Sequence, residues 1–343
     1  MSELPEIGVR LHGGLDPRSC IELAQAAEVN GFASVWFAEN PLQRGVLPAA
    51  SACALTTQRL RIGLGIVSVY SHHPTLIAME FAALDELAEG RARLGIGSGI
   101  GRLVERIGFA WRPLAAMRDA IAIVRGMLAG EEVSHRGQVF SVENAKLAFR
   151  PRSPQTPIYM AAMGDRSLQL CGRLADGLIV SNMCPPGYTE RAVAIVHGAA
   201  AADGRSPPAV VQYVPCIARP DRNAARQAAK TAIGEMLAAF WPVGSEWPAL
   251  RETIVAHSGI EKQEFVAVLD RLRRGESANR VLDDRFVEAF AIAGTTEECL
   301  AGAARYRRAG VDELVLTFAG PEPARDIGYL GRALGRKEGI ARP

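Results

Sequence analysis

Short apolar runs alternate with longer amphipathic stretches along most of this chain, and no other feature constrains its fold as strongly. Eight of the short runs have the length and the apolar, β-branched content of buried strands. They cover residues 7–11, 34–38, 60–68, 92–97, 158–161, 177–181, 210–217 and 313–318. Strands that are joined by helices pair in parallel, and a parallel sheet must be covered on both faces. Eight such units close into a barrel, so we predict an α/β fold, a TIM (β/α)8 barrel with insertions.

Turn and cap residues place the helices and the insertions. Asp16 followed by Pro17 is the start signal of one helix, and Thr295 with Glu298 forms a capping box at the start of another. The polar stretch 131–157 predicts a β excursion. Residues 235–290 are too many for one crossover and must hold extra helices. Because the chain has neither an internal repeat nor a low-complexity linker, we expect residues 1–343 to form a single domain with a helical insertion at about 235–290.

Charge balance and cysteine spacing limit the partners of this protein. The 39 basic and 37 acidic side chains leave a net charge of +2, which excludes a strongly basic nucleic-acid or membrane-surface protein. No stretch approaches the roughly 20 apolar residues that cross a bilayer, and the N-terminus lacks a signal-peptide pattern. The six cysteines never form a C-x-x-C pair, so they predict buried, reduced thiols. We expect a cytoplasmic protein that acts on a small molecule as a homodimer or higher homo-oligomer.

The loops that follow the predicted strands are rich in glycine and small polar residues. In a barrel of this kind the active site lies at these carboxyl ends of the strands. Such loops suit a flat, phosphorylated cofactor that is held by backbone N–H groups, and they contain no obvious hydrolytic triad. His72 and His73 are adjacent and cannot share one ligand face, and no carboxylate cluster completes a metal site. We therefore expect no bound metal.

One loop, Gly97-Ser98-Gly99, lies in a glycine-rich run that could be mistaken for a dinucleotide-binding motif. The G-x-G-x-x-G spacing fails, because the positions that would need glycine are Ile100 and Arg102. Two interpretations stay open for this loop. It contacts a phosphate or a cofactor, or it is a turn that only requires a positive φ angle.

Two titratable side chains stand out at the predicted strand ends. Glu39 follows the strand 34–38, where the alternation points it inward, and a buried carboxylate is costly unless it is paired or functional. Its alternatives are a role in chemistry and an ion pair at the barrel rim. His12 ends the first strand, where it either contacts substrate or cofactor or simply packs. The catalytic residues that we expect are Glu39 and His12.

Four segments carry a pattern that spans most of the chain. They are VWFAENP (35–41), RLRIGLGIV (59–67), GRARLGIGSG (90–99) and IYMAAMG (158–164). Together with the HP pair at 73–74 and the segments LDEL (84–87), ADG (175–177) and AGVDE (309–313), they resemble the bacterial luciferase-like superfamily. Within it, the chain is most similar to F420-dependent methylenetetrahydromethanopterin reductase and its relatives. The motifs are specific for the superfamily and not for one substrate.

The resemblance implies a TIM barrel that holds a flavin or the deazaflavin coenzyme F420 at its C-terminal end. It implies a non-prolyl cis peptide between Gly65 and Ile66 against the back of the ring, and a hydrogen bond from Ser68 to the ring. It further implies that backbone N–H groups near residues 163–167 hold the phosphate. The cofactor-binding residues that we expect are Asn40, Gly65, Ile66, Ser68, Gly97, Ser98, Gly99, Ala162, Met163, Gly164, Arg166 and Ser167.

The chain departs from its F420-dependent relatives at two positions. Many relatives carry Asp-His where this chain has Glu39-Asn40, and some carry a glutamate where it has Ile100. Three hypotheses follow. The first is a hydride-transfer oxidoreductase that uses F420, the second is an FMN-dependent luciferase-like monooxygenase, and the third is a non-catalytic flavin-binding paralogue. The longer anionic tail of F420 separates the first two, and Arg44, Arg102 and Arg166 fit such a tail.

Overall fold

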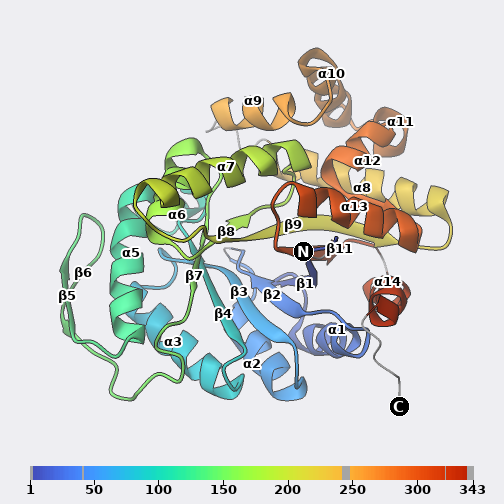
Figure 1. Cartoon of the computed structure of the whole chain (residues 1–343). Coiled ribbons are helices and arrows are strands. Elements are labelled where there is room, and N and C mark those ends of the chain that lie inside the picture. Colours follow the sequence, from blue (N-terminus) through green and yellow to red (C-terminus); the bar gives the residue numbers. More distant parts are fainter. Residues whose placement is uncertain (1–2, 41, 242–247, 321, 338–343) are drawn as a thin grey trace.

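Eight parallel strands form a closed barrel in the computed structural model, which describes residues 3–40, 42–241, 248–320 and 322–337. The barrel strands are β1 (Glu6–His12), β2 (Ser34–Ala38), β3 (Arg61–Ser68), β4 (Ala92–Gly97), β7 (Ile158–Ala161), β8 (Gly177–Val180), β9 (Ala209–Ala218) and β11 (Glu313–Phe318). They follow one another in this order, and β11 pairs with β1 to close the ring (Figure 1). The predicted TIM barrel is confirmed. Pro41 and residues 242–247, on which a motif and part of the predicted insertion fall, lie outside the described residues.

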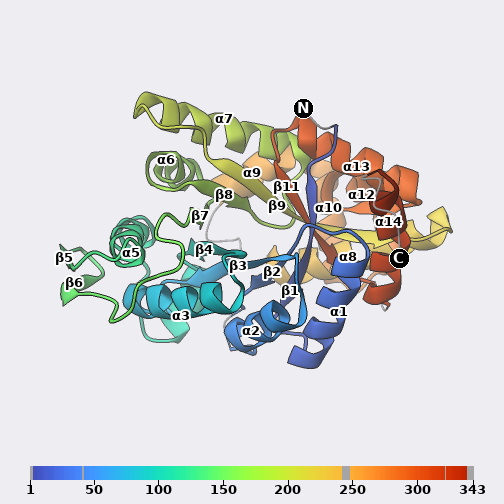
Figure 2. The same ribbon diagram turned by 60° about the horizontal axis from the view of Figure 1, so that its bottom comes forward.

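Helices cover the outside of the barrel, with α1, α2 and α3 on one side and α6 and α7 on the other (Figure 2). The covering helices are α1 (Pro17–Val29), α2 (Val46–Thr56), α3 (Pro74–Leu87), α5 (Pro113–Leu128), α6 (Asp165–Leu174), α7 (Pro186–Ala202), α13 (Thr296–Arg308) and α14 (Pro323–Lys337). The predicted caps are present. The Asp16 side chain accepts from the N–H groups of Arg18 and Ser19, and Thr295 and Glu298 cap each other.

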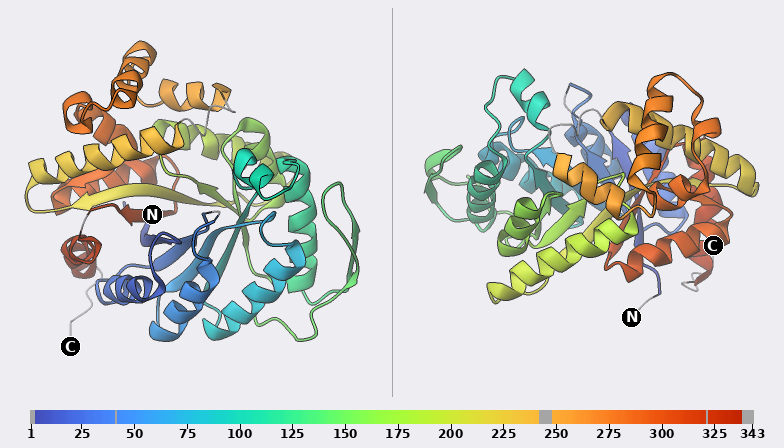
Figure 3. Two further views of the ribbon diagram at one scale, coloured as in Figure 1. Left: turned by 180° about the vertical axis from the view of Figure 1, so that it is seen from behind. Right: turned by 90° about the horizontal axis from the view of Figure 1, so that it is seen from above.

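Two excursions leave the barrel. The short antiparallel pair β5 (Val133–Arg136) and β6 (Ser141–Ala145) lies outside α5, within the stretch predicted as a β excursion. Between β9 and β11 the chain forms α8 (Arg222–Phe240), α9 (Pro248–Ala256), α10 (Lys262–Arg273), α11 (Ala278–Val281), α12 (Asp284–Phe290) and β10 (Ile292–Gly294). Helices α9 and α10 lie at the outer edge of the molecule, beyond α8 (Figure 3).

Large side chains fill the middle of the barrel, and glycines on neighbouring strands make room for them. Trp36 is completely buried and packs edge-to-face on Tyr159, with 5.6 Å between the ring centroids. A Cβ atom on Gly63 would lie 2.2 Å from Cδ2 of Trp36, and one on Gly177 would lie 2.1 Å from Cδ1 of Tyr159. These two positions therefore accept no larger residue without repacking.

A polar network closes the N-terminal end of the barrel. The carboxylate of Glu313 accepts hydrogen bonds from the Ser34 hydroxyl and from the Trp36 indole N–H, the latter at 2.9 Å. Arg61 lies 3.4 Å from the same carboxylate and pairs with Glu6 as well. Each charged group in this network has a partner, so the end of the barrel opposite the expected active site is electrostatically satisfied.

Candidate active site

The end of β3 carries the predicted backbone feature. The peptide bond between Gly65 and Ile66 is cis, and the pairing of β3 with β4 shifts by one residue there. Tyr213, which projects into the barrel from β9, donates its hydroxyl proton to the Gly65 carbonyl at 2.6 Å. The expected cis peptide is confirmed, and it bulges at the C-terminal end of the barrel.

The loop after β4 completes a floor of small residues beside this bulge. A Cβ atom on Gly97 would come within 3.0 Å of Cδ1 of Ile66, so glycine lets the isoleucine side chain lie over the strand end. Gly99 has a φ of +66°, which favours glycine, and the Ser98 carbonyl accepts from the Trp111 indole at 3.1 Å. The positive φ of Gly99 is the one that a turn requires, and contact of this loop with a cofactor stays a prediction.

Glu39 and Ser68 meet beside the bulge. The Glu39 carboxylate accepts from the backbone N–H of Ser68 and from the hydroxyl of Ser71, both at 2.7 Å. Nδ1 of His72 lies 3.6 Å from the same carboxylate, whose side chain is 11% exposed. The Ser68 hydroxyl accepts from the N–H of Tyr70 at 3.3 Å, so its own proton is available to a ligand. Glu39 thus fixes the loop that presents Ser68.

Sequence reasoning did not find Ser71 and His72 as partners of Glu39. The only signal was their position just after a strand end. Asn40, in contrast, turns away from the bulge, because its amide donates to Oε1 of Gln43 in its own loop at 3.1 Å. Arg44, which we expected near an anionic tail, donates instead to the carbonyls of Gly13 and Gly14.

His12 lies at the end of β1, half-buried. Its Nδ1 accepts from the backbone N–H of Gly14 at 3.1 Å, which places the proton of the neutral ring on Nε2. Burial, and next the positive charge of Arg10, lower the pKa of His12. The ring therefore presents an N–H donor with no partner among the described residues.

The N-terminus of α6 offers backbone N–H groups to an anion. Its N-cap is Gly164, which has no side chain to occupy them, and the Ser167 hydroxyl donates to the Gly164 carbonyl at 2.7 Å. The carboxylate of Asp165 would repel an anion there, but Arg191 pairs with both of its oxygens at 2.8 and 2.7 Å. The hydrogen bonds from Arg191 also lower the pKa of Asp165.

The other expected residues near α6 differ in exposure. Ala162 is buried, Met163 is half-buried with its carbonyl bonded to the Tyr188 hydroxyl, and Arg166 is exposed. The structure thus brings the bulge at Gly65, the small floor and the start of α6 to one end of the barrel. A flat ring with a phosphate tail fits this set, since Ile66 packs flat over Gly97 and the helix start has no side-chain cap.

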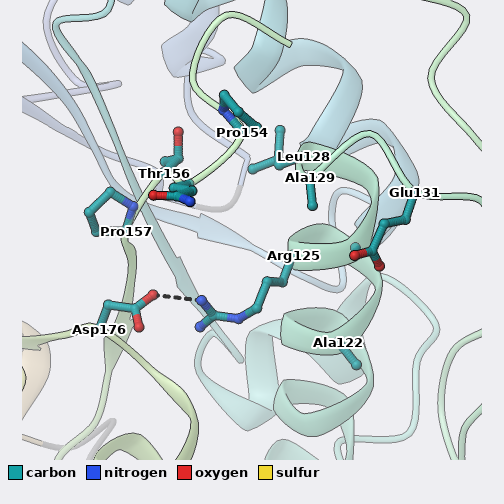
Figure 4. Close-up of a pocket in the computed structure, with 11 residues that line it drawn as sticks. Ala122, Arg125, Leu128, Ala129, Glu131, Pro154, Thr156, Pro157 and Asp176 are labelled. Atoms are coloured by element: carbon teal, nitrogen blue, oxygen red, sulfur yellow. Dashed lines mark hydrogen bonds and ion pairs between the residues drawn. The ribbon is translucent and has the colours of Figure 1, made fainter. Parts of the chain in front are cut away.

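A surface hollow of about 500 Å³ lies elsewhere. It is bounded by α5 and by the segments that precede β7 and β8, at the N-terminal ends of these strands (Figure 4). Arg125 reaches across it to Asp176 at 2.9 Å, and Asp176 also accepts from the backbone N–H of Ile158. Arg125 and Asp176 pair across the hollow, and it lies at the N-terminal ends of the strands, opposite the active-site end of a barrel.

Comparisons with known proteins agree with this geometry. The sequence model of the family described as luciferase-like monooxygenase matches residues 2–313. A 5,10-methylenetetrahydromethanopterin reductase of Archaeoglobus fulgidus is 30% identical over 319 residues, which cover 90% of this chain and 92% of the relative. The coenzyme F420 dependent tetrahydromethanopterin reductase from Methanopyrus kandleri superposes with a TM-score of 0.84 at 24% identity, over 96% of this chain and 98% of that one. The oxygenating constituent of 3,6-diketocamphane monooxygenase from Pseudomonas putida, in complex with FMN, superposes with a TM-score of 0.75 at 17% identity, over 97% of this chain and 98% of that one.

Proposed function

Because this chain belongs to the luciferase-like monooxygenase family, we propose that it is an oxidoreductase that transfers a hydride between coenzyme F420 and a small organic substrate. The relatives that carry F420 in their names support this cofactor. The observation that carries the proposal is the combination of the Gly65–Ile66 bulge, the packing of Ile66 against Gly97 and the uncapped start of α6. These features lie on the neighbouring strands β3 and β4 and after the next strand, β7. The ring can therefore lie on β3 and β4 while the phosphate reaches the start of α6.

In this proposal each expected residue has a stated role. The bulge and Gly97 support the ring, the Ser68 hydroxyl donates to it, and the backbone N–H groups of Asp165 and Arg166 hold the phosphate. The N–H of Ser167 already donates to the Gly164 carbonyl at 2.9 Å. When bound, F420 supplies or accepts two electrons and one hydrogen as a hydride, and the accompanying proton passes between the substrate and a protein group or water. Of the two expected catalytic residues, Glu39 orients Ser68, and His12 offers the N–H that can contact a substrate.

An FMN-dependent monooxygenase is the second candidate. The likeness to the FMN complex of the diketocamphane enzyme supports it, because the start of α6 serves the phosphate of FMN equally well. The two cofactors differ beyond that phosphate, where F420 continues as an anionic tail. The exposed Arg102 and Arg166 are available to such a tail and favour F420. A non-catalytic flavin-binding protein would use the same contacts without a substrate.

The cellular location and the oligomeric state of the enzyme are also proposals. No helix in the described part of the chain is long and apolar enough to cross a membrane. The six cysteines are free and buried, which supports a reducing, cytoplasmic location. We further propose that the protein is a homodimer or higher homo-oligomer and that residues 1–343 form one domain, in which about 235–290 is a helical insertion.

A pair of glycine variants tests the cofactor site. In Gly97→Ala the new methyl group would push Ile66 out of the floor, so we expect F420 to bind at least ~10-fold more weakly, a change of about 1.4 kcal/mol. Gly198→Ala adds the same methyl group on α7, where nothing lies within 4 Å, and should leave binding unchanged. Quenching of F420 fluorescence measures both. Equal affinity of the Gly97→Ala variant and the wild type would exclude this floor as the ring site.

A further inference from the structure

Three polar side chains at the C-terminal end of the barrel lack partners. Nε of Arg10 on β1, Oγ1 of Thr317 on β11 and Oδ1 of Asn182 after β8 are buried and have no hydrogen bond to any described residue. Arg10 and Thr317 face the barrel interior, because each lies two residues along its strand from Gly8 or Val315, which face the interior. Buried polar atoms are almost always hydrogen-bonded, so groups of this kind at the active-site end of a barrel require a ligand or water as their partner.

Arg10 is the only charged member of this group. Its guanidinium lies over the ring of Tyr213, 5.4 Å from the ring centroid, and forms no ion pair with any described residue. Burial lowers the pKa of Arg10, which shows the cost of holding this charge without a partner. The interior acid Glu313 cannot serve as its counter-charge, because it pairs with Ser34, Trp36 and Arg61 at the other end of the barrel.

The order of the strands separates Arg10 from the proposed phosphate site. In the ring β11-β1-β2-β3-β4-β7-β8-β9, strand β1 lies opposite β7, the strand that leads to α6. The Gly65–Ile66 bulge on β3 lies between them. An anion at Arg10 would therefore lie across the barrel end from the cofactor phosphate. That is the place for a substrate that approaches the ring, and not for the cofactor tail.

We propose that Arg10 binds a carboxylate group of the substrate, so that the enzyme acts on a small organic acid. This inference rests on the proposed function. A guanidinium presents parallel N–H groups that match the two oxygens of a carboxylate, and a single cation suits one negative charge better than the two of a phosphate. The Thr317 hydroxyl, on the neighbouring strand, can donate a neutral hydrogen bond, and the Nε2–H of His12, two residues along β1, adds a second donor. The unpartnered Oδ1 of Asn182 is an acceptor, so it does not serve the carboxylate.

The test compares acids with their isosteric amides. Benzoate and benzamide, and pyruvate and pyruvamide, are titrated into F420-loaded protein and into cofactor-free protein, with F420 and tryptophan fluorescence as the readouts. We expect each acid to bind the wild type at least ~10-fold more tightly than its amide, the scale of a hydrogen bond to a charged group. Arg10→Gln should remove this preference, and Arg10→Lys should retain part of it. Arg18→Gln, on the exposed side of α1, is the matched control and should bind like the wild type.

The outcomes separate the two proposals. Equal binding of acids and amides by the wild type would overturn the carboxylate assignment even if the variants failed to fold. The assignment is also overturned if Arg10→Gln weakens F420 binding and leaves the acids unaffected, because the guanidinium then serves the cofactor. If F420 does not bind while the cofactor-free protein still prefers acids, the proposed function fails and the carboxylate site stands.

Discussion

The two ends of the barrel each contain an interior arginine, and the two arginines have opposite surroundings. At the N-terminal end Arg61 pairs with Glu6 and Glu313. Burial alone would lower its pKa, but these partners raise it. At the C-terminal end Arg10 has only the face of Tyr213, and its pKa is lowered. Arg61 is therefore part of a paired network, whereas Arg10 is available to bind an anion.

This difference follows the division of labour in (β/α)8 barrels. The N-terminal ends of the strands serve stability, and the C-terminal ends carry the active site. Asp176 repeats the first pattern, since it pairs with Arg125 and Arg205 and accepts a backbone N–H. Of these interior charges, those at the structural end of the barrel are paired, and Arg10 at the functional end is not.

The largest effect on stability should come from removing Glu313 from the paired network at the N-terminal end of the barrel. Glu313→Ala would leave the Ser34 hydroxyl, the Trp36 indole and part of the charge of Arg61 unpartnered in the barrel. We expect the free energy of unfolding to fall by about 3–5 kcal/mol. Urea denaturation measures it. Glu6→Ala removes the exposed partner of Arg61 and should cost at most about 1 kcal/mol. If the two variants unfold at the same urea concentration, the network at this end does not stabilise the fold as described.

A change at the functional end should affect turnover more than stability. Glu39→Gln replaces one acceptor oxygen by an amino group, so the loop that carries Ser68 and Ser71 shifts. We expect turnover to fall by ~10²-fold, the scale of a misplaced active-site group, while cofactor affinity falls by at most about tenfold, the scale of the one hydrogen bond from Ser68. Steady-state rates measure the turnover of the variant, and titration of the same preparation with F420 measures its cofactor affinity. A variant with full turnover and a lowered unfolding free energy would make Glu39 a rim contact only.

The smallest effect concerns the charge that Arg10 places beside His12. Burial and Arg10 lower the pKa of His12 below 6.5, so between that lowered pKa and 6.5 the unfolded chain binds more protons. His12 should therefore contribute a loss of stability as the pH falls under 6.5, and none above it. Titration of the ring proton by NMR measures the pKa, which should rise in Arg10→Gln. An unchanged pKa in this variant would show that the guanidinium does not act on the ring.

Much of the fold could be predicted from the sequence because the signals are local. The bounds of β2, β4, β7 and β11 follow from apolar runs and flanking turn residues, and the structure reproduces them. The strand β10 has only three residues, and the helix α4 (Gly101–Arg106) begins without a side-chain cap, so neither carries a usable pattern. The cis peptide followed only from family resemblance.

The site was less predictable, because its contacts join distant strands. Arg10 alternates with apolar neighbours and could equally face solvent on an open sheet; only closure of the barrel makes it an interior charge. Likewise, the pairing of Asp165 with Arg191 joins residues on two helices, and no spacing rule connects them. The structure identifies these residues as parts of the site, because it shows which of their polar atoms have partners and which do not.

In our proposal the C-terminal end of this barrel holds F420 for hydride transfer. Equilibrium titration of the purified protein with F420 and with FMN, combined with oxygen uptake during turnover, decides between the two cofactors. We predict that F420 binds at least ~10-fold more tightly than FMN, about 1.4 kcal/mol, with an advantage that shrinks as salt screens the contacts to the anionic tail. No oxygen should be consumed. Equal or tighter binding of FMN together with oxygen uptake would refute hydride transfer from F420 and make the protein a monooxygenase.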